Sequence, residues 1–318
     1  KMKIKHRKSF ICGIKGLKLS RKEYKFIKKN KPWGIILFQR NIQNIIQTRD
    51  LTNSIKKLFN DPFYPILIDE EGGRVSRLRN IIDNSIFSGK YFGDLYSKDN
   101  MKFKLFYKVY IDQISYLLNL IGVNINTIPV LDLRRNNSHK IIGDRAYSGD
   151  KKIVNNIGKI TIENFQQNRI CTVIKHIPGH GLSKKDSHLE MPYIFKNKTY
   201  LERNDFEVFK NKKSLFAMTA HIVFDAIDIK NCITHSKKGI KYIRNKIGFK
   251  NLIITDDISM KALKYSFNKN ISIAYESGCN LVLHCNGNMR EMNILAKIAP
   301  KVDNFIIKKT SEFYKLLS

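Results

Sequence analysis

Short apolar runs alternate with longer amphipathic stretches along most of the chain. Eight of these runs have the length and composition of buried strands, and they occupy residues 10–14, 34–38, 66–68, 123–125, 172–174, 215–218, 252–254 and 281–283. Between them, apolar residues recur at spacings of three and four, as one face of a helix requires; examples are Phe103, Phe106, Tyr110, Ile114 and Leu117, and then Ile153, Ile157 and Ile160. Strands that alternate with helices predict a parallel sheet with helical crossovers.

The number of strands favours a closed barrel. Eight strand–helix repeats within 318 residues match an α/β fold of the (β/α)8 TIM-barrel type. The rival is an open, doubly wound sheet, which more often has a glycine-rich phosphate loop after its first strand; residues 13–18 lack the third glycine of that pattern. Without repeats or a Pro/Gly-rich break, we predict one catalytic domain over residues 1–318. Its motif-bearing core spans about 9–290 and a C-terminal helical tail spans about 291–318.

The chain is strongly basic, with 58 Lys and Arg against 27 Asp and Glu and a formal net charge of +31. Such an excess raises the possibility of a nucleic-acid or membrane partner. However, the lysines are spread along the whole sequence, and no nucleic-acid-binding motif accompanies them. No apolar run reaches the roughly 18 residues of a membrane span. We therefore expect neither a specific nucleic-acid partner nor a membrane partner.

The cysteines and the N-terminal residues bear on the compartment. Five cysteines without a CxxC pair, three of them in or beside apolar runs (Cys12, Cys171 and Cys279), predict buried free thiols in a reducing compartment. No Cys/His spacing fits a zinc site, so no metal is expected. The apolar stretch at residues 9–14 is too short for the core of a signal peptide. We predict a cytoplasmic protein.

Polar residues follow six of the predicted strands. They are residues 69–74, Asp132, Lys175 with His176, His221, Asp256 with Asp257, and residues 284–286. In a barrel the carboxyl ends of the strands meet at one mouth. Any single one of these groups could be a helix cap or a loop ion pair, but six together predict a site for a polyhydroxylated ligand.

Two places in this set have the composition of catalytic groups. Asp256 and Asp257 follow an apolar strand, and a carboxylate there can act as a nucleophile in glycosyl transfer. The alternative is that both cap a helix over residues 259–263. We expect a division in which one carboxylate faces the mouth and the other supports it. In the polar segment 175–188, Asp186 lies two residues before His188, and a carboxylate can orient such an imidazole for proton transfer.

Six segments together carry a resemblance to a known family. They are KHIPGHGLSKKDSH (175–188), IDEEGGRVSRL (68–78), IGDRAY (142–147), MTAHIVFDAID (218–228), ITDDISM (254–260) and SGCNLVLHCNGN (277–288). In sequence, order and spacing they resemble the bacterial β-N-acetylglucosaminidases of glycoside hydrolase family 3, the NagZ type. The resemblance runs from about residue 10 to about residue 288.

The resemblance implies a role for eight residues. Asp256 corresponds to the nucleophile, His188 to the acid–base, and Asp186 to its partner. The sugar-binding residues correspond to Asp69, Arg77, Arg145, Lys175 and His176. No metal or organic cofactor is implied. The role of His180, in the glycine turn, stays open between structural and functional.

The implied reaction is release of a terminal, non-reducing β-linked N-acetylglucosamine with retention of configuration. The implied substrates are muropeptide fragments that contain 1,6-anhydro-N-acetylmuramic acid, from peptidoglycan recycling. Residues 80–85 lack the prolines and aromatics often found there in relatives, so this segment can shape the acceptor side of the mouth. Two alternatives remain: a β-N-acetylglucosaminide phosphorylase, and a sugar-binding protein without catalysis. The oligomeric state is left open, with a monomer favoured.

Overall fold

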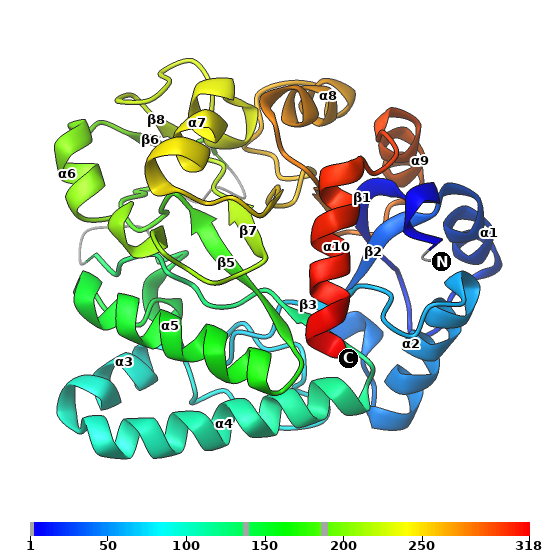
Figure 1. Ribbon diagram of the computed structural model, residues 1–318, viewed down its shortest axis with the longest axis horizontal. Coiled ribbons are helices and arrows are strands. Elements are labelled where there is room, and N and C mark those ends of the chain that lie inside the picture. The colour runs from blue at the N-terminus through cyan, green and yellow to red at the C-terminus, as the bar shows by residue number, and fades with distance from the viewer. Residues whose placement is uncertain (1–2, 136–139, 186–189) are drawn as a thin grey trace.

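Eight parallel strands form a barrel surrounded by helices (Figure 1). The computed structural model describes residues 3–135, 140–185 and 190–318. Hydrogen-bonded neighbours follow the order β10-β1-β2-β3-β4-β5-β7-β9. A parallel bridge between Ile254 and Leu281 places β9 beside β10 and closes the barrel. The predicted (β/α)8 barrel is therefore confirmed.

The barrel strands are short and buried along almost their whole length, as parallel strands covered on both faces must be. They are β1 (Lys8–Gly13), β2 (Pro32–Leu37), β3 (Ile66–Ile68), β4 (Ile125–Asn126), β5 (Cys171–Ile177), β7 (Phe216–Thr219), β9 (Leu252–Ile254) and β10 (Val282–His284). A small second sheet pairs β6 (Tyr193–Ile194) with β8 (Val223–Phe224).

Ten α-helices lie in the described part of the chain. They are α1 (Arg21–Asn30), α2 (Ile45–Phe59), α3 (Gly89–Lys98), α4 (Asn100–Leu120), α5 (Lys151–Gln167), α6 (Lys198–Arg203), α7 (Lys237–Tyr242), α8 (Phe267–Ser277), α9 (Met289–Ile298) and α10 (Asn304–Leu317). Several begin at a side chain that accepts a hydrogen bond from the first turn; Ser20 does so for α1, with Glu23 completing a capping box.

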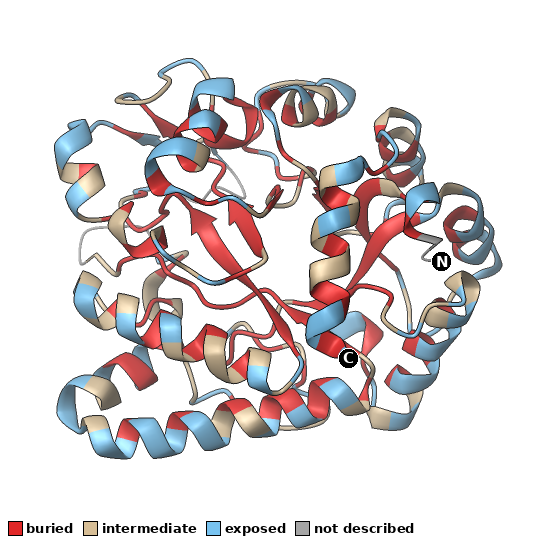
Figure 2. Ribbon diagram, in the orientation of Figure 1, coloured by how far each residue is buried: buried red, intermediate tan, exposed pale blue. Residues whose placement is uncertain are grey.

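Alternate strand residues point inward and outward. One apolar cluster, which includes Ile36, Val173 and Leu252, fills the barrel, and a larger one lies between the strands and the helices. Figure 2 shows the strands buried and the helices exposed mainly on their outer faces. This packing fixes the strands, and with them the side chains at their carboxyl ends.

Helix α10 lies across one end of the barrel strands (Figure 1). It packs against the cluster inside the barrel through Phe313 and Leu317. The indole N–H of Trp33, on β2, donates to Thr310 Oγ1 at 2.9 Å, and Phe216 makes edge-to-face contacts with both Trp33 and Phe313. Phe216 begins β7, so these contacts lie at the amino-terminal end of the strands. The opposite end is thereby left as the open mouth.

Some local predictions were wrong. Residues 259–263 form turns rather than a helix, and α8 begins only at Phe267. On α4, Phe106 is 43% exposed, whereas Tyr107 and Ile111 face the core. The two-residue strands β6 and β8 were not predicted, and β4 lies slightly later than residues 123–125. Short strands have too few residues to show a period, and an α4 that is apolar on most sides gives no single stripe.

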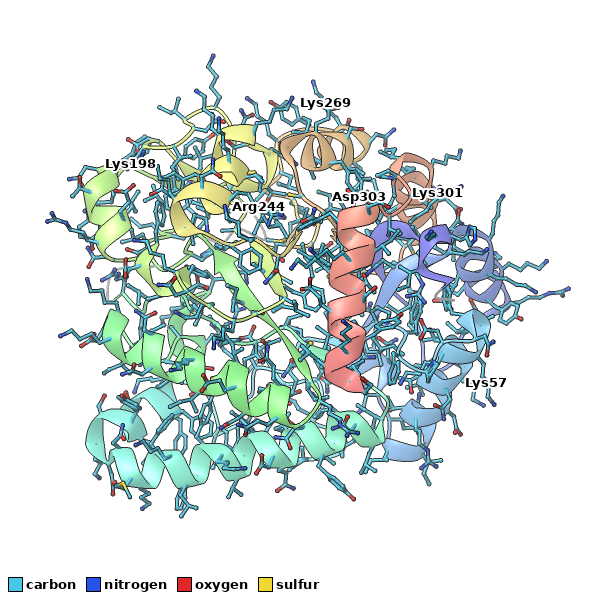
Figure 3. The ribbon with its side chains drawn as sticks, in the orientation of Figure 1. Lys57, Lys198, Arg244, Lys269, Lys301 and Asp303 are labelled. Atoms are coloured by element: carbon cyan, nitrogen blue, oxygen red, sulfur yellow. The ribbon has the colours of Figure 1, made fainter. Side chains whose placement is uncertain are left out.

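The charged side chains are spread over the molecule. Lys57, Lys198 and Lys269, on α2, α6 and α8, lie at different edges in Figure 3. Within the described ranges, no helix combines the length and apolar content needed to cross a bilayer. All five cysteines are free thiols, and Cys12, Cys171 and Cys279 are buried as the sequence predicted.

Candidate active site

A polar cavity of about 250 Å³ lies at the carboxyl ends of the strands. Residues from the ends of seven barrel strands or the loops after them contribute to its wall. The polar or charged members are Asp69, Arg74, Arg77, Thr127, Arg145, Lys175, His176, His180 and Asp256, together with the thiol of Cys285. The cavity therefore lies where (β/α)8 barrels hold their active sites.

Asp69, directly after β3, is the centre of a hydrogen-bond network. Its Oδ1 accepts from Thr127 Oγ1 at 2.7 Å and from Lys175 Nζ at 2.5 Å, and its Oδ2 accepts from Arg77 Nη2 at 2.8 Å. Burial raises the pKa of the Asp69 carboxyl, but Lys175, Arg77 and Arg145 outweigh burial and hold that pKa well below its ordinary value. Asp69 is therefore a fixed carboxylate.

Glu71, two residues further on, ties two cations together. Its carboxylate accepts two hydrogen bonds from Arg145, at 2.7 and 2.8 Å, and lies 2.6 Å from Lys175 Nζ. Burial lowers the pKa of Lys175, but the carboxylates of Asp69 and Glu71 outweigh burial and raise that pKa above its ordinary value. The ammonium therefore stays charged. Arg145 is placed by the short helix η3 (Gly143–Arg145) in the β4–α5 connection.

Asp132 organises the two histidines of the glycine turn. The carboxylate of Asp132 can only accept, so the 2.7 Å contact with His176 Nδ1 assigns a proton to that nitrogen. The other Asp132 oxygen accepts from the backbone N–H of His180 at 2.7 Å. Burial and the neighbouring His176 lower the pKa of His180 to about 4, so its ring is neutral near pH 7.

The two carboxylates after β9 have different surroundings. Asp256 lines the cavity, and its Oδ1 accepts from the backbone N–H of Asp257 at 2.7 Å. The side chain of Asp257 instead accepts from Ser259, through its N–H at 3.0 Å and Oγ at 2.8 Å, and from Cys285 N–H at 3.2 Å. Asp257 thus connects the ends of β9 and β10 and fixes the turn that presents Asp256.

The comparisons with known proteins identify the fold family. The model of the glycosyl hydrolase family 3 N terminal domain matches residues 4–311. The chain belongs to glycosyl hydrolase family 3. It is 31% identical to a β-hexosaminidase of Photobacterium profundum over 317 residues, which cover 96% of this chain and 92% of that protein. It is 32% identical to a β-hexosaminidase of Nitrosomonas eutropha, over 80% of this chain and 73% of that protein.

Solved structures agree with this family. NagZ from Neisseria gonorrhoeae in complex with N-trifluoroacetyl-D-glucosamine superposes with a TM-score of 0.82 at 26% identity, over 98% of this chain and 90% of that one. A family 3 β-N-acetylglucosaminidase from Paenibacillus gives a TM-score of 0.84 at 26% identity. The alignment covers 99% of this chain but 62% of the Paenibacillus chain.

The structure of this family 3 chain brings six of the eight candidate residues to one cavity: Asp69, Arg77, Arg145, Lys175, His176 and Asp256. The other two, Asp186 and His188, lie outside the described residues. Sequence reasoning did not assign partners to Glu71 and Asp132, although both follow predicted strands. Their position at strand ends was the available signal. Across the described ranges, no group of three or more His, Cys, Asp or Glu side chains is arranged to hold a metal ion.

His221, after β7, lies beside the turn that presents Asp256. Its Nδ1 is 2.7 Å from Thr234 Oγ1, and its Nε2 is 3.1 Å from the backbone carbonyl of Asp257. A carbonyl only accepts, so Nε2 carries the proton. Burial lowers the pKa of His221, although Asp256 acts in the opposite direction. A neutral His221 supports the turn that presents Asp256.

Proposed function

We propose that this chain is an exo-β-N-acetylglucosaminidase that removes a terminal, non-reducing β-linked N-acetylglucosamine with retention of configuration. The observation that supports it best is the position of Asp256 in one cavity with Asp69, Arg77, Arg145, Lys175 and His176. The names of the relatives, β-hexosaminidase and β-N-acetylglucosaminidase, support the same activity.

The size and polarity of the cavity fit one sugar ring. Its volume of about 250 Å³ lies below the roughly 300–1,000 Å³ of drug-sized pockets, which favours a single terminal residue over a long chain. Asp69 accepts hydrogen bonds from hydroxyl groups, and the arginines and Lys175 donate to hydroxyl or amide oxygens. Ion pairs hold these donors in place before any sugar enters, which lowers the entropy cost of binding.

We assign the two chemical steps to Asp256 and His188. An Asp256 carboxylate oxygen attacks the anomeric carbon and forms an ester-like bond while the glycosidic C–O bond breaks, and His188 gives its proton to the leaving oxygen. Water then attacks the same carbon, the bond to Asp256 breaks, and His188 takes the proton from that water. Two inversions give net retention. Asp186 is assigned the role of orienting and polarising the His188 imidazole.

The proposed physiological substrates are 1,6-anhydro-muropeptide fragments in cytoplasmic peptidoglycan recycling. The five free cysteines agree with a reducing compartment. The six candidate residues that the structure describes all come from one chain, so we propose that a monomer suffices. We propose no metal or organic cofactor, because two proton transfers and a carboxylate nucleophile complete the reaction.

Hydrolysis of 4-nitrophenyl β-N-acetylglucosaminide, with the β-glucoside as control, tests the activity. We expect turnover of the N-acetyl substrate alone, its loss in Asp256→Ala, and no change in Asp50→Ala, which removes an exposed carboxylate on α2. No turnover of either glycoside by folded wild type contradicts the proposal. Formation of a sugar 1-phosphate in phosphate buffer, absent in a non-nucleophilic buffer, would instead assign a phosphorylase.

Azide separates the two catalytic roles. In Asp256→Ala, azide can replace the missing nucleophile, so a single inversion should give the α-glycosyl azide. In His188→Ala, azide should attack the covalent intermediate on Asp256, so a second inversion should give the β-glycosyl azide. The opposite anomers, or the same anomer from both variants, would contradict the assignment.

A further inference from the structure

A second cavity lies behind the loop that follows β3 and carries Arg77, on the helix side of the barrel. It has a volume of about 420 Å³ and lies between residues 82–87 and the helices α3 and α4, which lie side by side in Figure 1. We call it the α3–α4 groove. Its floor includes Ile82 and Asn84, so part of the segment 80–85 faces this groove.

The groove is aromatic and uncharged. Five rings contribute to its wall: Phe87, Tyr91, Phe92, Phe106 and Tyr110. Phe87 and Tyr110 are 5.4 Å apart between ring centroids, and Phe92 and Tyr110 are 4.9 Å apart. Among the described residues, no charged side chain lines it, in a chain with 58 basic and 27 acidic residues. Such a lining favours a neutral aromatic ligand over an ion or a charged head group.

One buried acceptor in this groove has no partner within the described structure. Asn84 is 1% exposed, and its Oδ1 makes no hydrogen bond. The orientation of the amide is fixed because Nδ2 donates to Glu70 Oε1 at 2.7 Å. A buried acceptor without a donor is costly, so a ligand that supplies one N–H or O–H at this point satisfies it.

Glu70 connects the groove to the sugar site. Its Oε1 accepts from Asn84, and its Oε2 accepts from the backbone N–H groups of Arg77 at 2.6 Å and Leu78 at 3.0 Å. Gly72 lies in the same loop at φ +82, and a Cβ there would come within 2.5 Å of Tyr110 Oη. The loop that carries Arg77 is therefore packed between the two cavities.

From this arrangement we propose that the α3–α4 groove is a second binding site, for a neutral aromatic molecule with one hydrogen-bond donor, coupled to the sugar site through Asn84, Glu70 and the backbone of Arg77. Binding at the groove does not depend on the proposed function. The coupling does rest on it, because the coupling is measured as a change in sugar binding. An occupied groove fixes Asn84, and thereby Glu70 and the Arg77 loop, in the arrangement that binds sugar.

Indole is the probe, with benzothiophene as an isostere that lacks the N–H. Ligand-observed NMR on the full chain, with saturating N-acetylglucosamine to occupy the sugar site, should give an indole Kd of about 1 mM or tighter. Benzothiophene should bind about tenfold more weakly, because Asn84 Oδ1 then stays without a donor. Equal affinities, or no binding of indole, overturn the site.

Two tryptophan substitutions on α4 locate the binding. Val109→Trp fills the groove and should abolish indole binding, whereas Tyr116→Trp adds the same side chain at an exposed α4 position outside the groove lining and should leave it unchanged. Equal loss in both variants, or in neither, overturns the assignment. The comparison of indole with benzothiophene uses wild type, so it decides the question even if Val109→Trp fails to fold.

The coupling is measured separately. Saturating indole should lower the KM for 4-nitrophenyl β-N-acetylglucosaminide by about fivefold in wild type and in Tyr116→Trp, and not in Val109→Trp. An unchanged or raised KM overturns the coupling while leaving the site intact. If wild type does not turn over the aryl glycoside, the proposed function fails and the coupling is read from the Kd of N-acetylglucosamine with and without indole.

Discussion

Glu71 receives both hydrogen bonds of the Arg145 guanidinium fork while its carboxylate also lies 2.6 Å from Lys175 Nζ. All three side chains are almost fully removed from solvent. The arrangement is a buried ion-pair network in which one acid fixes two of the proposed sugar-binding cations. Removing that acid leaves the Arg145 guanidinium without the carboxylate that accepts from it, whereas Lys175 keeps its contact with Asp69.

Glu71→Gln should therefore lower both stability and sugar affinity. We expect the free energy of unfolding to fall by about 3 kcal/mol and the KM for the aryl glycoside to rise about tenfold, since Arg145 loses the carboxylate that fixes its position. Urea denaturation and steady-state kinetics measure the two effects. Asp94→Asn breaks exposed ion pairs with Lys90 and Arg134 and should cost about 1 kcal/mol or less. Equal effects of the two substitutions would argue against the network.

The pKa of His180 predicts a loss of stability in mild acid. Its pKa is lowered from 6.5 to about 4 in the folded state, by burial first and by His176 second. The unfolded chain then takes up the proton at higher pH than the folded chain does. The resulting loss is absent above pH 6.5, grows as the pH falls towards about 4, and reaches about 3 kcal/mol in all.

Urea denaturation at pH 7 and pH 4.5 measures this loss. His180→Gln should show a smaller fall in stability between the two pH values than wild type does. His235→Gln provides a matched comparison, since burial also lowers the pKa of that histidine to about 4 at a different place. If both variants keep the pH dependence of wild type, other groups cause it.

Thr310→Val should destabilise the protein without changing catalysis. Trp33 is fully buried, and its N–H donates to Thr310 Oγ1 at 2.9 Å. Loss of that acceptor should cost about 1–3 kcal/mol in urea denaturation. The kcat and KM should stay unchanged, because α10 packs at the end of the barrel away from the cavity. Ser311→Ala, on the same helix, serves as the control. A changed KM in Thr310→Val would contradict the separation of the two ends.

The basic surface should bind nucleic acid only weakly. With lysines dispersed over many elements, we expect binding of a random DNA duplex at low salt that disappears by about 200 mM salt. Fluorescence anisotropy at several salt concentrations measures it. Sequence preference, or binding that persists at the higher salt concentration, would require a dedicated site.

The strands could be predicted because they are continuous apolar runs that end in polar residues. β3 and β9 have the predicted bounds, Ile66–Ile68 and Leu252–Ile254. The helix over 259–263 that the capping alternative required does not form, because Asp257 accepts from Ser259 and fixes a turn there. Phe106 shows a different limit: its spacing fits the core stripe, yet it lines the α3–α4 groove, and only the position of α3 decides this.

The candidate site could likewise be predicted only in part. Asp69, Lys175 and Asp256 could be placed at one mouth because the carboxyl ends of parallel strands converge. The pairing of Glu71 with Arg145 joins residues 74 positions apart and depends on where η3 lies. The neutral groove behind the Arg77 loop could not be predicted either, since three separate segments form it.

Asp69, Lys175 and Asp256 lie on a barrel strand or within two residues of its end, whereas His188 comes later in the chain, in the connection between β5 and β6. Insertions or deletions in that connection can therefore accumulate during evolution without shifting Asp69, Lys175 or Asp256. Selection for a new leaving group can act on one segment while selection for the sugar acts on another. The barrel thus allows the choice of sugar and the choice of leaving group to change separately.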